Sequence, residues 1–305
     1  MQHPERQPLR PNVFVVGDAK CGTTSLHRMF ELTESMGTAR SRKELHFFSA
    51  PELMLKTRGP GDERIAHAII HDEASYLAEF AHLPPDLAYV FDVSPSYLQE
   101  PAAAHRIHAF APEARIVILL REPAAKVFSQ YVHLWSDGRE TLPFPEAYEQ
   151  SAARRMAGFS TMFDYEAGGY YAEAVERYIG LFGRDRVTVI FFEEMFGSGD
   201  AGRSRLEAFL GLRLPARPLP RMNMGGRVKS PVWSTLLGND ALRRRVKQVF
   251  PLSVRTRIGE YFRSSVVVER PELDAATATA LRRHYASNVL RLETILGRKT
   301  GWAAA

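Results

Sequence analysis

Short apolar segments alternate with amphipathic segments along this chain. The apolar segments are rich in β-branched and aromatic residues, as expected for strands buried on both faces of a sheet. The segments between them carry apolar residues at helical spacing, which predicts helices packed on that sheet. The predicted strands are 13–16, 88–93, 115–121 and 187–192. The predicted helices are 23–30, 64–82, 101–110, 123–135, 145–157, 170–182 and 202–210, followed by a helical remainder after 231 with one break near 264–271.

Strands that alternate with helical crossovers predict an α/β fold, with a mostly parallel central sheet and helices on both faces. Clusters of Gly and Pro predict loops at 51–63, 136–145 and 213–231. Residues 1–11 are predicted to be a loose lead-in to the folded chain. Ligands of such sheets bind outside the carboxyl ends of the strands. We therefore expect the chemistry of this chain in the residues that follow each strand.

Composition narrows the classes of function. Forty Lys and Arg against 35 Asp and Glu give a net charge of +5, which suits an anionic ligand such as a nucleotide or an acidic glycan. No nucleic-acid recognition motif is present, and no metal-ligand cluster is evident. The single cysteine, Cys21, excludes an internal disulfide and fits a reducing compartment. We see no signal peptide and no run near the ~20 apolar residues of a membrane helix, so we predict a cytoplasmic location.

The segment after the first strand has the composition of a phosphate-binding loop. Gly17 and Gly22 bracket four residues, and hydroxyl side chains follow. This spacing is that of G-x-x-x-x-G-K-[ST], a loop that cradles phosphates at a helix N-terminus. Thr23 occupies the position of the lysine, and Lys20 comes three residues earlier. The loop therefore suits phosphate but not obviously a magnesium-bound nucleoside triphosphate. The alternative is an ordinary strand–helix turn in which Thr24 and Ser25 only cap the helix.

The same segment, Gly17-Asp-Ala-Lys-Cys-Gly-Thr-Thr-Ser-Leu26, resembles the 5′-phosphosulfate loop of sulfotransferases that use 3′-phosphoadenosine-5′-phosphosulfate (PAPS). A second segment, Arg121-Glu-Pro-Ala-Ala-Lys-Val-Phe-Ser129, is similar to their 3′-phosphate motif. The alternative for Arg121 is a surface ion pair. The resemblance runs from about 12 to 302, is closest to the bacterial and glycan branch, and implies a single domain with a P-loop-like fold.

The resemblance also implies roles for individual residues. The cofactor-binding residues would be Lys20, Cys21, Gly22, Thr23, Thr24, Ser25, Arg121 and Ser129, and Lys20 would stabilise the leaving phosphate. Arg227 and Lys229 are candidates from a basic loop near the nucleotide, and a solvated loop is their alternative.

The segment Lys43-Glu-Leu-His-Phe-Phe48 resembles the family motif that carries the catalytic glutamate. Glu44 would then be the general base that takes a proton from the acceptor. His46 is the alternative base, or a group that holds the acceptor. A solvated carboxylate and a structural histidine are the simpler alternatives.

The segment Asp92-Val-Ser-Pro-Ser-Tyr97 is similar to a further family element. It predicts Asp92, Ser94 and Tyr97 as substrate-binding residues, and a strand-end cap is the alternative for Asp92. The sequence departs from some glycan-modifying members at Val93, where those members carry a lysine.

The resulting hypothesis is a PAPS-dependent sulfotransferase that acts on a hydroxyl or amine of a glycan, lipid or small molecule and releases adenosine 3′,5′-bisphosphate (PAP), without a metal. The rival hypotheses are a P-loop kinase for a small molecule and a non-catalytic PAPS-binding protein. Acceptor identity and oligomeric state stay open, and the loops 51–63 and 136–165 are where we expect acceptor specificity.

Overall fold

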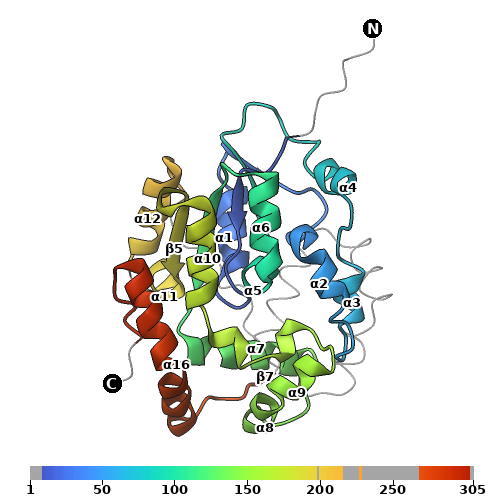
Figure 1. Cartoon of the computed structure of the whole chain (residues 1–305), viewed down its shortest axis with the longest axis vertical. Helices are drawn as coiled ribbons and strands as arrows, with labels where there is room; N and C mark the ends of the chain where they lie inside the picture. The colour runs from blue at the N-terminus through green and yellow to red at the C-terminus, as the bar shows by residue number, and fades with distance from the viewer. Residues whose placement is uncertain (1–8, 198, 216–226, 229–267, 303–305) are drawn as a thin grey trace.

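The computed structural model describes residues 9–197, 199–215, 227–228 and 268–302. Its central sheet has five parallel strands in the order β2-β3-β1-β4-β5 (Figure 1). The α/β fold with a parallel sheet is therefore confirmed. The strands are β1 (Val13–Val15), β2 (Met36–Thr38), β3 (Tyr89–Val93), β4 (Arg115–Leu120) and β5 (Val187–Phe191).

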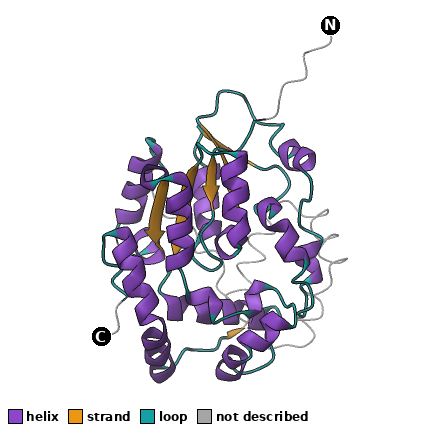
Figure 2. Cartoon of the chain, viewed as in Figure 1, coloured by secondary structure: helices purple, strands orange, loops and turns teal. Residues whose placement is uncertain are grey.

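Side chains alternate between the two faces of the sheet and build two hydrophobic cores. On β4, Ile116 and Ile118 belong to one core, whereas Val117 and Leu119 belong to the other. Because both faces are covered, the strands have no polar face, and the continuous apolar runs of the sequence follow from this burial. Figure 2 shows the helices on both sides of the strands. The first core includes residues of α6 (Pro101–Phe110), α7 (Pro123–Ser136), α10 (Ala172–Phe182) and α16 (Ala275–Leu296), and the second includes residues of α1 (Thr23–Glu31) and α12 (Ala201–Leu210).

The shorter helices lie between these main elements along the chain. They are α2 (Ala50–Met54), α3 (Glu63–Ala66), α4 (Glu73–Ala78), α5 (Ser96–Gln99), α8 (Phe144–Glu149), α9 (Ser151–Met156) and α11 (Phe192–Phe196). A separate antiparallel pair joins β6 (Arg227–Val228) to β7 (Val268–Glu269). No described helix has the length and apolar content needed to span a bilayer.

Several predicted elements need correction. The single helix predicted over 64–82 is two short helices, α3 and α4, because the backbone N–H of Ile70 donates to Leu45 O outside any helix and the Asp72 carboxylate starts α4 by accepting from Ser75 N. The helix predicted over 145–157 is divided into α8 and α9 at Gln150. The predicted loop 51–63 contains most of α2 and the start of α3.

Further elements were absent from the prediction, and β2 and α5 are two of them. The edge strand β2 has only three residues, including Gly37, and therefore lacks an apolar run. The four-residue helix α5 follows Pro95 directly and is too short for a helical pattern. Most of the predicted loop 213–231 and the helical segment before 268 lie outside the described residues.

Candidate active site

A cavity of about 750 Å³ lies at the carboxyl ends of the strands. The chain leaves β1 toward β2 on one side of the sheet and leaves β4 toward β5 on the other. This reversal opens a crevice between neighbouring strands, which is where ligands bind in parallel sheets. Predicted residues from three separate segments meet there. They are Lys20, Gly22, Thr23, Thr24, Ser25, Glu44, His46, Arg121 and Ser129.

The loop after β1 presents backbone N–H groups to this cavity. Gly22 has a φ of 95° and precedes α1, whose first turn has no side-chain cap. A Cβ at Gly22 would lie 2.2 Å from the ring of Phe196, so the close approach requires glycine. Lys20 also has a positive φ, of 67°. The uncapped helix start is therefore available to bind an anion.

Cys21 lies in this loop but points away from the cavity. Its side chain is fully buried in the core on the α1 side of the sheet, and burial raises the pKa of the thiol. The predicted contact of Cys21 with a cofactor is therefore restricted to its backbone.

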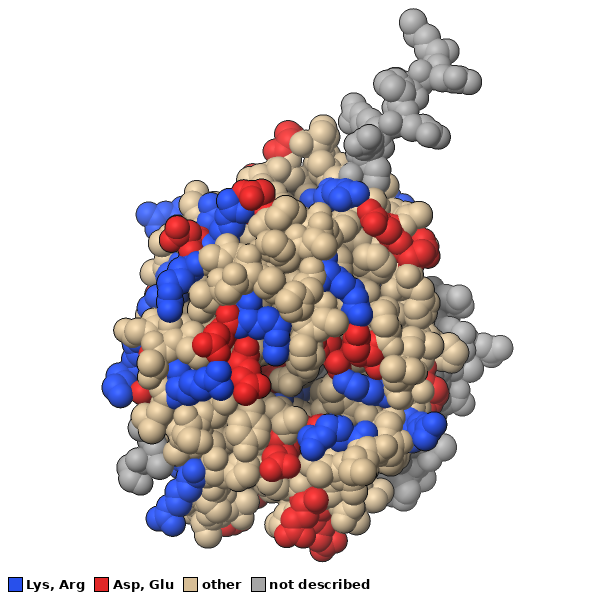
Figure 3. Space-filling model, in the orientation of Figure 1, with Lys and Arg blue, Asp and Glu red and all other residues tan. Residues whose placement is uncertain are grey.

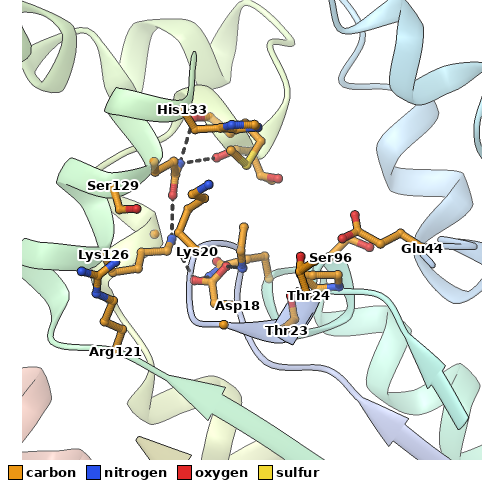
Figure 4. Close-up of a pocket in the computed structure, with 18 of the residues that line it drawn as sticks. Asp18, Lys20, Thr23, Thr24, Glu44, Ser96, Arg121, Lys126, Ser129 and His133 are labelled. Carbon is orange, nitrogen blue, oxygen red and sulfur yellow. Dashed lines mark hydrogen bonds and ion pairs between the residues drawn. The ribbon is translucent and has the colours of Figure 1, made fainter. Parts of the chain in front are cut away.

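A buried ion pair anchors the loop after β1 to α7. Asp18 Oδ2 lies 2.8 Å from Lys126 Nζ, and both side chains are almost fully buried. The Asp18 carboxylate also accepts from Gln99 Nε2 at 2.7 Å and from its neighbour, Ala19 N, at 2.6 Å. Lys126 Nζ donates to Gln130 Oε1 at 2.7 Å. This network joins the loop after β1 to α7, and Figure 4 shows Lys126 reaching from α7 to Asp18 at the wall of the cavity.

The cations of the two predicted phosphate motifs, Lys20 and Arg121, both line the cavity. Among the described residues, no ion pair joins Lys20 or Arg121 to Asp or Glu within 4 Å. Burial lowers the pKa of Lys20, and Arg121 and Lys43 lower it further, whereas Asp137 opposes the shift. The Arg121 guanidinium stacks on Phe192 at 4.6 Å. Positive charges held close together in this way favour binding of an anion between them.

Glu44 lies at the other side of the cavity, next to a lysine and a histidine. Glu44 Oε1 is 2.5 Å from Lys43 Nζ, and Glu44 Oε2 is 3.5 Å from His46 Nε2. Burial alone would raise the pKa of Glu44, but neighbouring positive charge, from Lys43 first and from His46 when its ring is protonated, holds it below its usual value. The carboxylate is therefore ionised and able to accept a proton, and its side chain is 36% exposed.

Lys43 connects this carboxylate to the phosphate loop. Its ammonium donates to Thr23 Oγ1 and Thr24 Oγ1, each at 3.2 Å, while it contacts Glu44. The base candidate and the anion site therefore share one cation. A change of charge at the base candidate therefore changes the electrostatic potential at the anion site, and the reverse also holds.

The predicted substrate-binding residues Asp92, Ser94 and Tyr97 do not line the cavity. All three side chains are buried, with at most 1% exposed. The Asp92 carboxylate accepts from Tyr97 at 2.8 Å and from Tyr76 and Ser94 at 2.9 Å. Burial raises the pKa of Asp92 to about 6. These side chains support the cavity wall, because Ser94 Oγ accepts from the backbone N–H groups of Leu45 and His46. Direct contact with an acceptor would require this wall to open.

Arg227 and Lys229 also do not contribute described side chains. Arg227 belongs to β6, but its side chain lies outside the described part of the structure, as does all of Lys229. Their contact with a nucleotide stays a prediction.

The sequence reasoning missed a set of cavity residues on one face of α7. Lys126, Gln130 and His133 recur every three to four residues and face the cavity together with Ser129 (Figure 4). This helical spacing of polar residues within an otherwise apolar helix was the available signal. Burial lowers the pKa of His133, and the nearby Lys20 lowers it further.

The sequence profile of the Sulfotransferase family matches residues 11–216. The chain belongs to the sulfotransferase family. The prediction drawn from the resemblance is thereby confirmed at the level of the family. The matched range includes both predicted phosphate motifs and the segment around Glu44.

Solved and curated relatives agree with this assignment. A sulfotransferase from Alicyclobacillus acidocaldarius has the same fold with a TM-score of 0.72 and 31% identity, over 96% of this chain and 99% of that one. The human bifunctional heparan sulfate N-deacetylase/N-sulfotransferase 2 is 22% identical over 66% of this chain. Human heparan sulfate glucosamine 3-O-sulfotransferase 6 is 23% identical over 67% of this chain. The chain spans 22% and 53% of the length of these two curated relatives.

Proposed function

We propose that this protein transfers a sulfuryl group from PAPS to a hydroxyl or amine of an acceptor. The observation that carries the proposal is the position of Lys20 and Arg121 at the ends of adjacent strands, where neither cation has a carboxylate partner in the part of the chain that the structure describes. An uncapped helix start lies beside Lys20, and an ionised glutamate lies at the opposite side of the same cavity. Two phosphate sites and one base are the groups that this transfer requires.

The cavity residues fit a nucleotide with phosphates at both ends. Lys20 and the N–H groups of the first turn of α1 would hold the 5′ end, and Arg121 with Ser129 would hold the 3′-phosphate. When bound, PAPS supplies the sulfuryl group and a phosphate leaving group. Lys20 stabilises the negative charge that develops on that leaving group.

Glu44 takes the proton of the acceptor in this proposal. Its Oε1 lies 2.5 Å from Lys43 Nζ, so the carboxylate is both ionised and oriented. Among the described residues, no group of three or more His, Cys, Asp or Glu side chains is arranged to hold a metal ion, and the roles above use side chains and backbone alone.

In this proposal, the acceptor is a glycan, lipid or small molecule that bears a hydroxyl or an amine. The names of the two human relatives favour a glycan. On the face drawn in Figure 3, basic and acidic side chains are interspersed, so that face carries no broad patch of one sign to attract a polyanion. A cytoplasmic location stays a prediction.

The two rival functions remain distinguishable by their ligands. A P-loop kinase needs a lysine where this loop has Thr23, and it would turn over magnesium ATP. A non-catalytic binding protein would hold PAPS without any transfer, and Glu44 would be dispensable.

The decisive experiment is transfer of label from isotopically labelled PAPS to a panel of glycan, lipid and phenol acceptors, followed by mass spectrometry. The Glu44→Gln variant should bind PAP nearly as the wild type does and lose about 10²- to 10⁴-fold in turnover. Glu34→Gln, at an exposed glutamate shortly after the end of α1 that does not line the cavity, is the matched control. Turnover of Glu44→Gln within threefold of the wild type would remove Glu44 from the role of base.

A further inference from the structure

Ser96 contacts the imidazole of His46 through the ring nitrogen that does not face Glu44, and Ser49 contacts Ser96 in turn. His46 Nδ1 lies 2.8 Å from Ser96 Oγ, and Ser96 Oγ lies 2.7 Å from Ser49 Oγ. Ser49 Oγ donates to the backbone carbonyl oxygen of His46 at 3.1 Å. Ser49 is fully buried, and the side chain of His46 is 13% exposed. The two ends of this chain of hydrogen bonds are therefore largely shielded from bulk water, whereas Ser96, between them, is partly exposed and lines the cavity.

The backbone carbonyl oxygen of His46, at the end of these hydrogen bonds, determines which hydroxyl donates to which. A carbonyl oxygen only accepts, so the one hydroxyl proton of Ser49 is used on His46 O. Ser96 then donates its proton to Ser49 Oγ, and Ser96 Oγ is left to accept from His46 Nδ1. All three contacts are satisfied when neutral His46 carries its proton on Nδ1. Its Nε2 is then an acceptor, 3.5 Å from Glu44 Oε2.

We propose that Ser96, held by Ser49, is a positioning residue that keeps the proton of neutral His46 on Nδ1, so that Nε2 can take a proton from Glu44. The proposal rests on the proposed function, in which Glu44 is the base. The acceptor's O–H or N–H bond breaks as its proton bonds to Glu44. The new O–H bond of Glu44 then breaks as the proton bonds to Nε2. Glu44 returns to a carboxylate, and the imidazolium donates to Ser96 and to Glu44.

The backbone of His46 is held as firmly as its ring. Its φ is 56°, in the left-handed region that a side chain such as histidine rarely adopts. The N–H groups of His46 and Leu45 both donate to Ser94 Oγ, at 3.2 Å. This anchoring offsets the cost of the unusual conformation, which is of the kind found where structure serves a site.

The surroundings of the ring keep it neutral before it accepts a proton. Burial lowers the pKa of His46, Lys43 and Arg42 lower it further, and Glu44 opposes them. These are the charged groups that face the ring from its own segment. Ser49 and Ser96, from the two elements packed against it, are neutral. A neutral ring with Nδ1 protonated is the form that can receive a proton on Nε2.

The test is the tautomer of His46, measured by long-range ¹H–¹⁵N NMR on protein labelled in its histidines, with His46→Gln to assign the signal. The wild type should show the proton on Nδ1. Ser49→Ala frees the Ser96 proton to donate to Nδ1, and Ser96→Ala removes the acceptor, so both variants should move the ring proton to Nε2. Ser136→Ala removes a hydroxyl that donates to Val132 O at the end of α7, and it should leave the tautomer unchanged.

A second readout separates positioning from mere support of the fold. In Ser96→Ala the pH midpoint of His46 should fall, because the imidazolium loses an acceptor, and kcat should fall about 10-fold with KM unchanged. A wild-type ring protonated on Nε2, or a tautomer that neither serine variant moves, overturns the proposal. If Glu44→Gln keeps full turnover while the tautomers behave as expected, the base assignment is wrong and the serine chain stands.

Discussion

Breaking the buried pair between Asp18 and Lys126 is expected to cost several kcal/mol of stability. At 2.8 Å and an effective dielectric constant of about 20, the attraction between two unit charges is about 6 kcal/mol. Desolvation of both groups offsets part of this attraction. Removing one partner nevertheless costs about 3–5 kcal/mol, because the other charge is left buried and unpaired.

The two single variants leave different groups unpaired. Lys126→Met leaves the Asp18 carboxylate with two donors, Gln99 Nε2 and Ala19 N. Asp18→Asn leaves the ammonium of Lys126 with Gln130 Oε1 as its acceptor. Asp18→Asn keeps a side-chain oxygen that can still accept from Lys126, so the ammonium would have neutral acceptors but no counter-charge, and both single variants should fall within this range.

Thermal and denaturant unfolding measure the loss of stability in each variant. An unfolding entropy of about 2.1 cal/mol/K per residue gives about 0.64 kcal/mol/K for this chain, so 3–5 kcal/mol corresponds to a fall in Tm of about 5–8 °C. The double variant should cost less than the sum of the singles. Arg28→Met, which breaks a half-exposed pair with Glu31, is the control and should cost about 0.2–1 kcal/mol. The reasoning would be refuted if the destabilisations of the two single variants were additive in the double variant, or if each were no larger than that of the control.

Three further outcomes are expected. PAP at 100 times its Kd should add about 2.7 kcal/mol to the free energy of unfolding and so raise the Tm clearly. AMP or magnesium ATP should raise the Tm much less. Equal shifts for PAP and AMP would contradict the two-site assignment. Arg121→Ala should remove most of the difference between PAP and AMP, since it deletes a charge-assisted contact to the 3′-phosphate, and a retained difference would place that phosphate elsewhere. The pKa of Asp92 is raised from about 3.9 in the unfolded chain to about 6, so the stability that its protonated form contributes is present below pH 4 and is lost as the pH rises through 6. The wild type should therefore lose stability over that window relative to Asp92→Asn, measured by urea unfolding at each pH, and parallel pH profiles would show that the Asp92 carboxyl is not buried as described.

The sequence by itself determined the order of the strands along the chain and the residues that follow them. Four strands are visible as apolar runs because burial on both faces of the sheet favours apolar side chains at most positions. Lys20, Glu44 and Arg121 were identified from local motifs, since each motif depends on a short stretch of backbone. The edge strand β2 escaped because three residues including Gly37 carry no periodic signal.

Only the tertiary structure decided which polar groups meet. Asp18 and Lys126 are 108 positions apart in the chain, and nothing in either local sequence shows that they pair and so join the phosphate loop to α7. Asp92 follows a strand end as predicted, yet the packing of Tyr76 and Tyr97 buries its carboxylate and keeps it from the cavity. Hydrogen bonds, ion pairs and burial depend on distances between segments that the fold brings together, so the local pattern of a sequence does not encode them directly.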